Sequence, residues 1–400
     1  MRFLMVCMQY PTGPGQSYMT TELADALVVA GHEVEVLLLD WSAPPGGMTE
    51  RFETPSGVRG VRCTPRVLPV AKGAVRAASK FVLGGMHAGR TARRVVDFGR
   101  IDVVIAWAPA IAVAPVLAEA RRAGVPHRLL FIWDVFPDHH REIGRIPAGL
   151  PYRIARAWEQ RLMAGFTAIL CTLPGNADYL RRRFRIGPQQ WLLVTPIWSD
   201  TTPLPPVDRA AMRRRHGLPE DRPIAVFGGQ LVEGRGFEQM LGAAEAGEAS
   251  GLPLVFLFVG DGRLAPLLRA RAAAQANVLH RPALPREGYL ELLGACDVGM
   301  AATVPGVTSF SIPTKTIDYL RAGLPVVAAV EHGSDYVAIL RRYGVGDAVA
   351  FGEREGFLRL AERLATDPQV RAAVRAAAPL CLEEVFDVRH AVAKVLEATG

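Results

Sequence analysis

Along the whole chain, short apolar runs rich in β-branched residues alternate with longer segments of helical periodicity. This alternation is typical of βαβ units built on a parallel sheet. In the first half the pattern predicts a helix over Tyr18–Ala30 and strands at Phe3–Met8, Val34–Leu39, Val103–Ala106, Leu129–Trp133, Ala168–Cys171 and Leu192–Val194. The second half predicts strands at Ile224–Phe227, Leu254–Val259, Val298–Ala301 and Val326–Ala328, with helices at Phe237–Ala246, Leu264–Ala274 and Arg286–Ala295.

The stretch "TPIWSDTTPLPPVD", residues 195–208, holds four prolines and few core-forming residues, which marks it as a linker. A chain of 400 residues is also too long for one ordinary core. We therefore predict an α/β protein with two Rossmann-like domains, residues 1–197 and 207–383, joined by residues 198–206. A C-terminal helix, about residues 384–400, is expected to pack back on the first domain. Because open α/β sheets bind ligands beyond their carboxyl strand ends, we expect the two domains to face each other across a cleft.

The net charge of +7 indicates an anionic partner: a phosphorylated substrate, an anionic membrane surface or nucleic acid. Five cysteines form no Cys-x-x-Cys pair and lie mostly in apolar runs, which predicts buried thiols in a reducing cytoplasm. The start, "MRFLMVCMQYP", suits a first strand better than a secretory leader. The longest uncharged stretch, residues 103–118, falls short of the roughly 20 residues that span a bilayer, so we expect no transmembrane helix.

The stretch "SFSIPTKTIDYLRAGLPVVAA", residues 309–329, contains Lys315, one of only four lysines beside 42 arginines. Pro313 disfavours helix for the residue before it, and Thr314 is a suitable N-cap, so we predict a helix from about Lys315 to Arg321 that ends before Gly323. Lys315 then lies in the first turn, where anions bind, with Asp318 on the same face. A compact ammonium suits a phosphate, and a carboxylate accepts two hydrogen bonds from a ribose diol. The alternative is a solvated lysine beside an aspartate that favours a helix start.

Two further segments, "VFGGQLVEGRGFEQML" and "FLFVGDGRLAPLLRA", each have the order strand, glycine-containing turn and helix, and "NVLHRPALPREGYLELLGACDVGMA" follows them before the stretch with Lys315. The first half adds two segments to this pattern: the glycine loop and helix of "YPTGPGQSYMTTELADALVVAGHEVEVL", and "FIWDVFPDHHREIG" at the end of a predicted strand. Together these segments resemble GT-B glycosyltransferases of family 4, the retaining sugar-nucleotide transferases. The bacterial surface-polysaccharide subgroup, which carries Pro-Ser-Lys where this chain has Pro313, Thr314 and Lys315, is the nearest in pattern.

The resemblance implies roles for individual residues. Asp318 corresponds to the carboxylate that holds the ribose, and Lys315 and Arg235 to the diphosphate contacts, with Gly229 allowing the backbone to approach the phosphates. Gln230 replaces the usual arginine. The base is expected near His280 and Arg281, read largely through backbone groups; the alternative is that both are ordinary surface residues at a strand end. The first of two family glutamates is replaced by Phe310, so Thr308 or Ser309 is expected to hold the donor sugar. Gly15 is expected to approach the donor phosphate or sugar from the other domain.

Asp134, His139 and His140 lie just beyond a predicted strand end, where catalytic groups of such sheets collect. We predict that Asp134 orients or deprotonates an acceptor hydroxyl, assisted by a histidine. The alternatives are that Asp134 only caps the following turn and that the two histidines are ordinary surface residues. A nicotinamide enzyme is disfavoured, because the glycine loop after the first strand has Tyr18 where the dinucleotide fingerprint needs a third glycine.

No Asp-x-Asp metal motif occurs, and fixed positive groups can stabilise a departing diphosphate, so we expect neither a metal nor another cofactor. Residues 66–100 hold eight basic residues against one acidic residue, with apolar positions between them, which suits an anionic membrane surface or a solvated helix face. Nucleic acid is not expected as a partner. The predicted function is transfer of a sugar from a UDP-linked donor to a small-molecule or lipid-linked acceptor, with retention, in the cytoplasm or at the inner face of its membrane. A sugar-nucleotide epimerase and a silent nucleotide-binding protein are the rivals.

Overall fold

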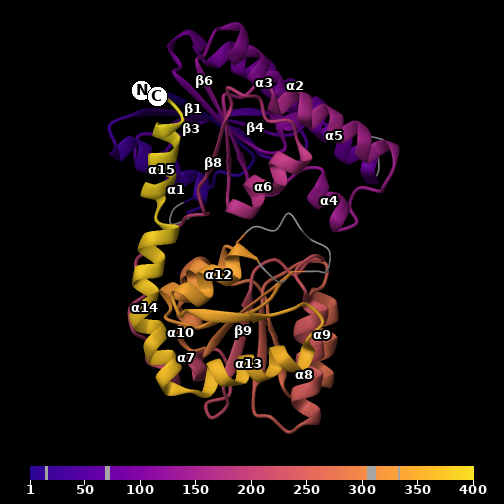
Figure 1. Cartoon of the computed structure of the whole chain (residues 1–400), viewed down its shortest axis with the longest axis vertical. Helices are drawn as coiled ribbons and strands as arrows, with labels where there is room; N and C mark the ends of the chain where they lie inside the picture. The colour runs from indigo at the N-terminus through magenta and orange to yellow at the C-terminus, as the bar shows by residue number, and fades with distance from the viewer. Residues whose placement is uncertain (14–16, 68–72, 304–311, 332–333) are drawn as a thin grey trace. The chain divides into compact units, whose positions relative to one another are not determined.

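The computed structural model describes all residues except 14–16, 68–72, 304–311 and 332–333. It contains two compact units, each an open α/β sheet with helices around it (Figure 1). The N-terminal unit comprises residues 1–199 and 388–400, and the C-terminal unit comprises residues 200–303 and 312–387. Residues 195–208 between them form neither helix nor strand.

The described part of the N-terminal unit forms an eight-stranded sheet in the order β3-β4-β2-β1-β5-β6-β7-β8. All neighbours are parallel except β3 and β4. The strands are β1 Arg2–Cys7, β2 Glu33–Leu39, β3 Thr49–Glu53, β4 Arg59–Cys63, β5 Val103–Trp107, β6 His127–Ile132, β7 Ala168–Cys171 and β8 Trp191–Val194. The helices are α1 Met19–Val29, α2 Gly73–Val95, α3 Ala110–Arg122, α4 Asp138–Glu142, α5 Leu150–Met163, α6 Pro174–Arg183 and α15 Val388–Glu397, and Phe98–Arg100 forms one 3-10 turn.

The described part of the C-terminal unit forms a six-stranded parallel sheet in the order β11-β10-β9-β12-β13-β14. Its strands are β9 Ile224–Gly228, β10 Val255–Val259, β11 Val278–Arg281, β12 Val298–Ala302, β13 Val326–Ala329 and β14 Gly346–Val349. Its helices are α7 Arg209–Arg215, α8 Phe237–Ala249, α9 Ala265–Ala274, α10 Arg286–Gly294, α11 Lys315–Arg321, α12 Asp335–Arg342, α13 Arg354–Thr366 and α14 Pro368–Phe386. The C-terminal segment that belongs to the N-terminal unit begins at Val388, and α15 there contacts α1.

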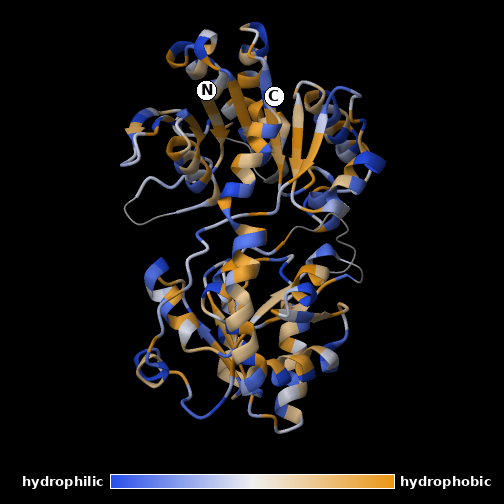
Figure 2. Cartoon of the chain, turned by 60° about the vertical axis from the view of Figure 1, so that its left-hand side comes forward, coloured by the Kyte–Doolittle hydropathy of each residue, from blue (hydrophilic) through white to orange (hydrophobic). Residues whose placement is uncertain are grey.

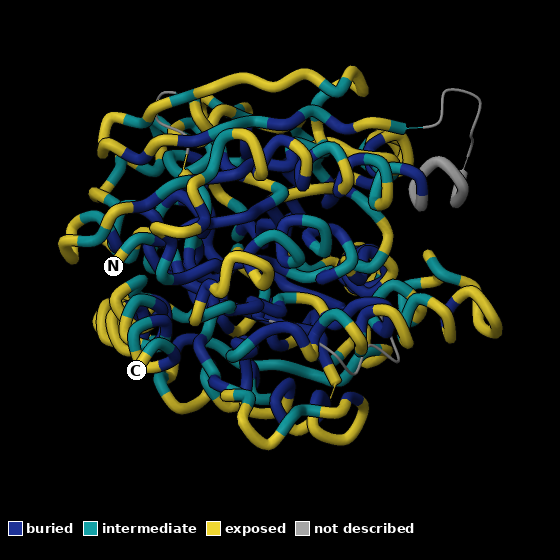
Figure 3. The backbone as a smooth tube through the Cα atoms, turned by 90° about the horizontal axis from the view of Figure 1, so that it is seen from above, coloured by how far each residue is buried: buried dark blue, intermediate teal, exposed yellow. Residues whose placement is uncertain are grey.

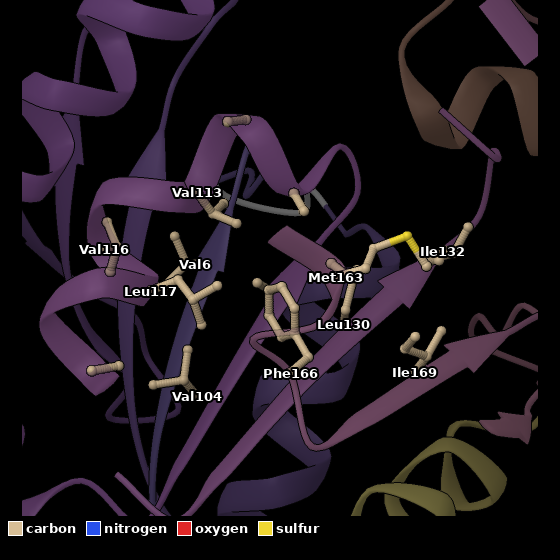
Figure 4. Close-up of a cluster of buried hydrophobic side chains, with 14 of the residues drawn as sticks. Val6, Val104, Val113, Val116, Leu117, Leu130, Ile132, Met163, Phe166 and Ile169 are labelled. Atoms are coloured by element: carbon tan, nitrogen blue, oxygen red, sulfur yellow. The ribbon is translucent and has the colours of Figure 1, made fainter. Parts of the chain in front are cut away.

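Central strands are apolar along their whole length because helices cover both faces of each sheet. β5 (VVIAW) and β10 (VFLFV) are buried at every position. Figure 2 shows the apolar strands inside each unit and the hydrophilic residues on loops and outer helix faces, and Figure 3 shows the same division as burial. Figure 4 shows one core cluster, in which Phe166, Leu117 and Leu130 pack with residues of β1, β5 and β7.

The sequence pattern missed four strands, β3, β4, β11 and β14, because each is short and largely polar or half-buried. The predicted helix after Pro313 begins and ends as expected, at Lys315 and Arg321. The predicted N-cap role of Thr314 is wrong: its backbone is already in the right-handed helical region, and its side chain makes no capping hydrogen bond. All five cysteines are unpaired and buried, as predicted. Within the described residues, no helix combines the length and apolarity that crossing a membrane requires.

Candidate functional site

The strand order of the C-terminal unit places its ligand crevice beside β9. β9 comes first in the chain and lies inside the sheet. The chain first adds β10 and β11 on one side of β9, and then crosses over to add β12, β13 and β14 on the other side. Open α/β sheets bind ligands beyond the carboxyl ends of strands at such a switch point. The residues at this point are the glycine-rich loop after Gly228, the end of β12 and the start of α11.

Glycines allow the loops after β9 and β10 to lie directly against each other. A Cβ on Gly260 would lie 1.9 Å from the carbonyl oxygen of Gly229, and one on Gly262 would lie 2.3 Å from that of Leu231. Both glycines also have positive φ angles, 149° and 153°, which side-chain-bearing residues rarely adopt. The Gly-Asp-Gly turn seen in the sequence therefore shapes the crevice from behind, while its Asp261 accepts a hydrogen bond from the backbone of Ala283.

Lys315 brings a positive charge to this crevice. Its Nζ lies 3.3 Å from the centroid of the Phe227 ring, and a Cβ on Gly229 would lie 3.9 Å from the same nitrogen. Within the part of the chain that the structure describes, no carboxylate forms an ion pair with this ammonium. Burial, and then the charge of Arg235, lower the pKa of Lys315 well below its usual value. An anion in the crevice would relieve both effects, because it supplies the missing opposite charge.

Asp318 lies one turn after Lys315, and its carboxylate is held by a residue that sequence reasoning did not select. Both terminal nitrogens of the Arg286 guanidinium donate to it, Nη1 to Oδ2 and Nη2 to Oδ1, each at 2.6 Å. The Asp318 side chain is 13% exposed and that of Arg286 43% exposed. An ionised carboxylate has about four acceptor positions, so two remain for a diol. Arg286 therefore fixes the orientation of Asp318 and leaves part of the carboxylate's hydrogen-bonding capacity unused.

The predicted base-binding pair lies at the end of β11, next to the Gly-Asp-Gly turn. The ring of His280 is 3.1 Å, through Nε2, from the carbonyl oxygen of Gly260. The guanidinium of Arg281 donates to the carbonyl oxygens of His216 and Gly217 and so fastens the turn after α7 to the sheet. The backbone carbonyl of Arg281 also accepts a hydrogen bond from the N–H of Gly260 at 3.0 Å, so both the side chain and the backbone of Arg281 hold the turns together. Arg235 and Gln230 are exposed in the loop after β9. Gly15, Thr308 and Ser309 lie outside the described residues.

In the N-terminal unit, Asp134 and His139 come together just after β6. Asp134 Oδ1 lies 4.0 Å from His139 Nε2, and the aspartate side chain is 60% exposed. His140 packs edge-on against Phe136, with 5.3 Å between ring centroids. Burial, and then the charges of His139 and Arg145, lower the pKa of His140. Asp134 acts in the opposite direction on the pKa of His140, but of the two histidines it is His139 that lies within ion-pair distance of Asp134.

An aromatic cluster lies at the ends of β5 and β6 beside this pair, and the sequence analysis did not select it. Trp107 stacks on Phe131 with 5.5 Å between ring centroids, and Trp133 lies 5.8 Å from Trp107 and 6.1 Å from Trp198. The indole N–H groups of Trp107 and Trp133 are buried and have no hydrogen-bond partner among the described residues. Buried N–H groups are normally satisfied, so these two unpartnered donors are unusual. The available signal was a tryptophan at the end of β5 and another directly after the adjacent strand β6.

Two buried carboxylates of the N-terminal unit serve its structure. Asp138, at the start of α4, accepts hydrogen bonds from the Tyr152 and Tyr179 hydroxyls, each at 2.6 Å, and ion pairs with Arg156 and Arg183. Burial opposes its ionisation, but the hydrogen bonds and the two charges outweigh burial and lower the pKa of Asp138. Its place beside Asp134 and His139 in the chain makes it the anchor of that segment.

Glu159 of α5 caps the neighbouring helix α3. Its carboxylate accepts from the backbone N–H groups of Ala110 at 2.6 Å and Ile111 at 3.2 Å. Burial raises the pKa of Glu159 to about 7, and the two hydrogen bonds work against this rise. This contact spans 49 residues of sequence, which is why no local pattern revealed it.

Comparison with known proteins supports the class that this geometry defines. Residues 14–198 match the family model described as the glycosyl transferase 4-like domain. A probable glycosyltransferase, WbjE of Pseudomonas aeruginosa, is 22% identical over 231 residues, which are 54% of this chain and 54% of that protein. The chain thus aligns with about half the length of this curated relative.

Solved structures with a similar fold cover nearly the whole chain. Sucrose-phosphate synthase from Thermosynechococcus elongatus is 13% identical with a TM-score of 0.71, over 99% of this chain and 98% of that one. HepE of Anabaena, solved in complex with UDP-glucose, is 13% identical with a TM-score of 0.68, over 99% of both chains. Two parallel-sheet units of this kind define the GT-B fold of glycosyltransferases. The predicted resemblance is confirmed for the N-terminal unit by its match to the glycosyl transferase 4-like domain, and for the whole chain by the GT-B fold.

Proposed function

We propose that the protein transfers a sugar from a nucleotide-diphosphate sugar, with UDP as the nucleotide, to a hydroxyl acceptor. The observation that carries the proposal is the ammonium of Lys315, which lies beside Gly229 and over Phe227 with no carboxylate partner among the described residues. A desolvated cation at the switch point of an open sheet is suited to a diphosphate. Asp318, oriented by Arg286, is then placed one helical turn away to accept the ribose hydroxyls. HepE, solved with UDP and with UDP-glucose, supports the choice of base.

The same groups account for the chemistry. As the bond between sugar and diphosphate breaks, negative charge grows on the leaving group, and Lys315 and Arg235 stabilise it as fixed charges. This is why we propose a metal-independent reaction. Retention of configuration, implied by the family resemblance, would follow from attack on the same face as the departing phosphate. Thr308 or Ser309 and Gly15 remain the proposed contacts to the donor sugar and phosphate.

On the acceptor side, Asp134 with His139 is the proposed pair that orients and deprotonates the attacking hydroxyl. The unpartnered indole N–H groups of Trp107 and Trp133 are suited to further acceptor hydroxyls. A lipid-linked acceptor at the inner face of the cytoplasmic membrane is consistent with the basic segment 66–100. Its described part includes α2, on which Val82 and Met86 are exposed on the same side as Arg90.

Calorimetry with UDP and UDP-sugars tests the donor site. Lys315→Ala and Asp318→Ala are each expected to weaken binding by roughly 10- to 100-fold, since each removes a charged hydrogen-bonding group. Lys394→Ala, which removes an exposed lysine paired with Glu397, is the matched control. Unchanged donor affinity in both site variants would disprove the site.

The pH dependence of binding provides a second measurement. The pKa of Lys315 is lowered in the free protein, and a bound diphosphate raises it, so binding takes up protons. Affinity should therefore fall as pH rises through the window between the two values. Titrations in two buffers of different ionisation enthalpy measure this uptake.

Isomerisation of the donor without any acceptor would instead favour an epimerase.

A further inference from the structure

Helix α5 buries Tyr152, Glu159 and Met163 but exposes three large apolar side chains. Leu150, Ile154 and Trp158 are 67%, 51% and 56% exposed. Their spacing of four residues aligns them along one face of the helix. A surface helix of a globular protein normally buries its apolar stripe, so an apolar row on the outer face is unusual. In Figure 1, α5 lies on the outside of the N-terminal unit.

The inner face of α5 is held by hydrogen bonds and ion pairs. Tyr152 and Arg156 contact the buried Asp138. Glu159 caps α3, and the Gln160 amide exchanges two hydrogen bonds with the backbone of Arg185. These contacts fix the helix without help from its outer face. The three exposed apolar side chains therefore contribute little to folding. Large apolar side chains gathered on one exposed face are typical of a contact surface.

Positive charge flanks the apolar stripe. Arg153 and Arg161 are exposed on the same helix, and among the described residues neither pairs with a carboxylate. The one carboxylate of α5, Glu159, is buried and faces inward. The outer face of α5, defined as Leu150, Arg153, Ile154, Trp158 and Arg161, is thus apolar and cationic with no acidic residue.

We propose that the outer face of α5 binds an anionic membrane surface. Tryptophan and aliphatic side chains insert at the boundary between headgroups and acyl chains, and arginines meet the lipid phosphates. A second copy of this chain is the poorer occupant, because two such faces would bring four unpaired arginines together. The proposal does not depend on the transfer reaction. It assigns membrane contact to an element outside residues 66–100.

Co-flotation of the full chain with vesicles tests the proposal. Wild-type protein is expected to float with vesicles of phosphatidylglycerol and phosphatidylcholine, and more weakly with phosphatidylcholine alone. The double variant Ile154→Ser/Trp158→Ser should reduce the partition coefficient by roughly tenfold or more, because the membrane then buries two fewer apolar side chains. The double variant Arg153→Glu/Arg161→Glu should reduce binding to the anionic vesicles and leave binding to phosphatidylcholine vesicles unchanged. Leu380→Ser, at an equally exposed apolar position on α14, is the matched control and should have no effect.

Three outcomes would overturn the proposal. One is wild-type protein that does not float with anionic vesicles. Another is binding lost in Val82→Ser/Met86→Ser of α2 but unchanged in the α5 variants, which would leave residues 66–100 as the membrane contact. A third is a wild-type dimer by light scattering that Trp158→Ser converts to a monomer. The UDP affinity and the unfolding temperature are measured for every variant as controls. Both are expected to be unchanged, so that a loss of vesicle binding reflects neither the donor site nor unfolding.

Discussion

Lys315 of the C-terminal unit and Asp138 of the N-terminal unit are both charged groups withdrawn from water near strand ends, yet their surroundings differ. Asp138 has two tyrosine hydroxyls and two arginines around its carboxylate. Lys315 has an aromatic ring, a glycine and a second cation, Arg235. A withdrawn charge with every partner inside the protein serves the fold, whereas one with no opposite charge is poised for a ligand. The comparison separates a structural centre from the proposed binding centre within one chain.

The largest expected effect tests the structural centre. Asp138→Asn leaves Arg156 and Arg183 without their shared counter-charge, so we expect a loss of roughly 3–5 kcal/mol in the free energy of unfolding. Asp134→Asn, four residues earlier and mostly exposed, is the control and should change stability by less than about 0.5 kcal/mol. Urea unfolding measures both. Equal stability of the two variants would remove the structural role of Asp138.

A second effect concerns Glu159, the other buried carboxylate of that unit. Its pKa is raised to about 7, above the ordinary value of 4.5, so the folded protein binds the proton more tightly than the unfolded chain. This contribution is complete below pH 4.5 and is lost as pH rises through about 7. The shift corresponds to on the order of 3 kcal/mol. Glu159→Gln should remove this part of the pH dependence of the unfolding free energy. A wild-type and variant difference that stays constant from pH 4 to pH 8 would contradict it.

The smallest effect on stability is expected at Lys315. Lys315→Met removes a cation that burial and Arg235 disfavour and keeps an apolar stem against Phe227. The lost cation–π contact, worth about 1–2 kcal/mol, offsets the relieved desolvation, so the free energy of unfolding should change by less than about 1 kcal/mol. Denaturant unfolding of the ligand-free protein measures it. A loss above about 2 kcal/mol would place Lys315 with Asp138, as a residue of the fold.

The sequence alone determined the α/β class, most central strands and the helix from Lys315 to Arg321. These features depend on local signals: β-branched runs, a proline before a helix and a glycine after it. It also placed Lys315 and Asp318, the two groups of the proposed donor site, together on one short helix.

Only the tertiary structure paired Asp318 with Arg286, surrounded Asp138 with residues from α5 and α6, and turned the apolar side of α5 outward. These pairings join residues 14 to 45 positions apart. They depend on which strands become neighbours and on how each helix is rotated over the sheet. A local pattern of residue types does not encode either quantity, because packing between distant elements sets both.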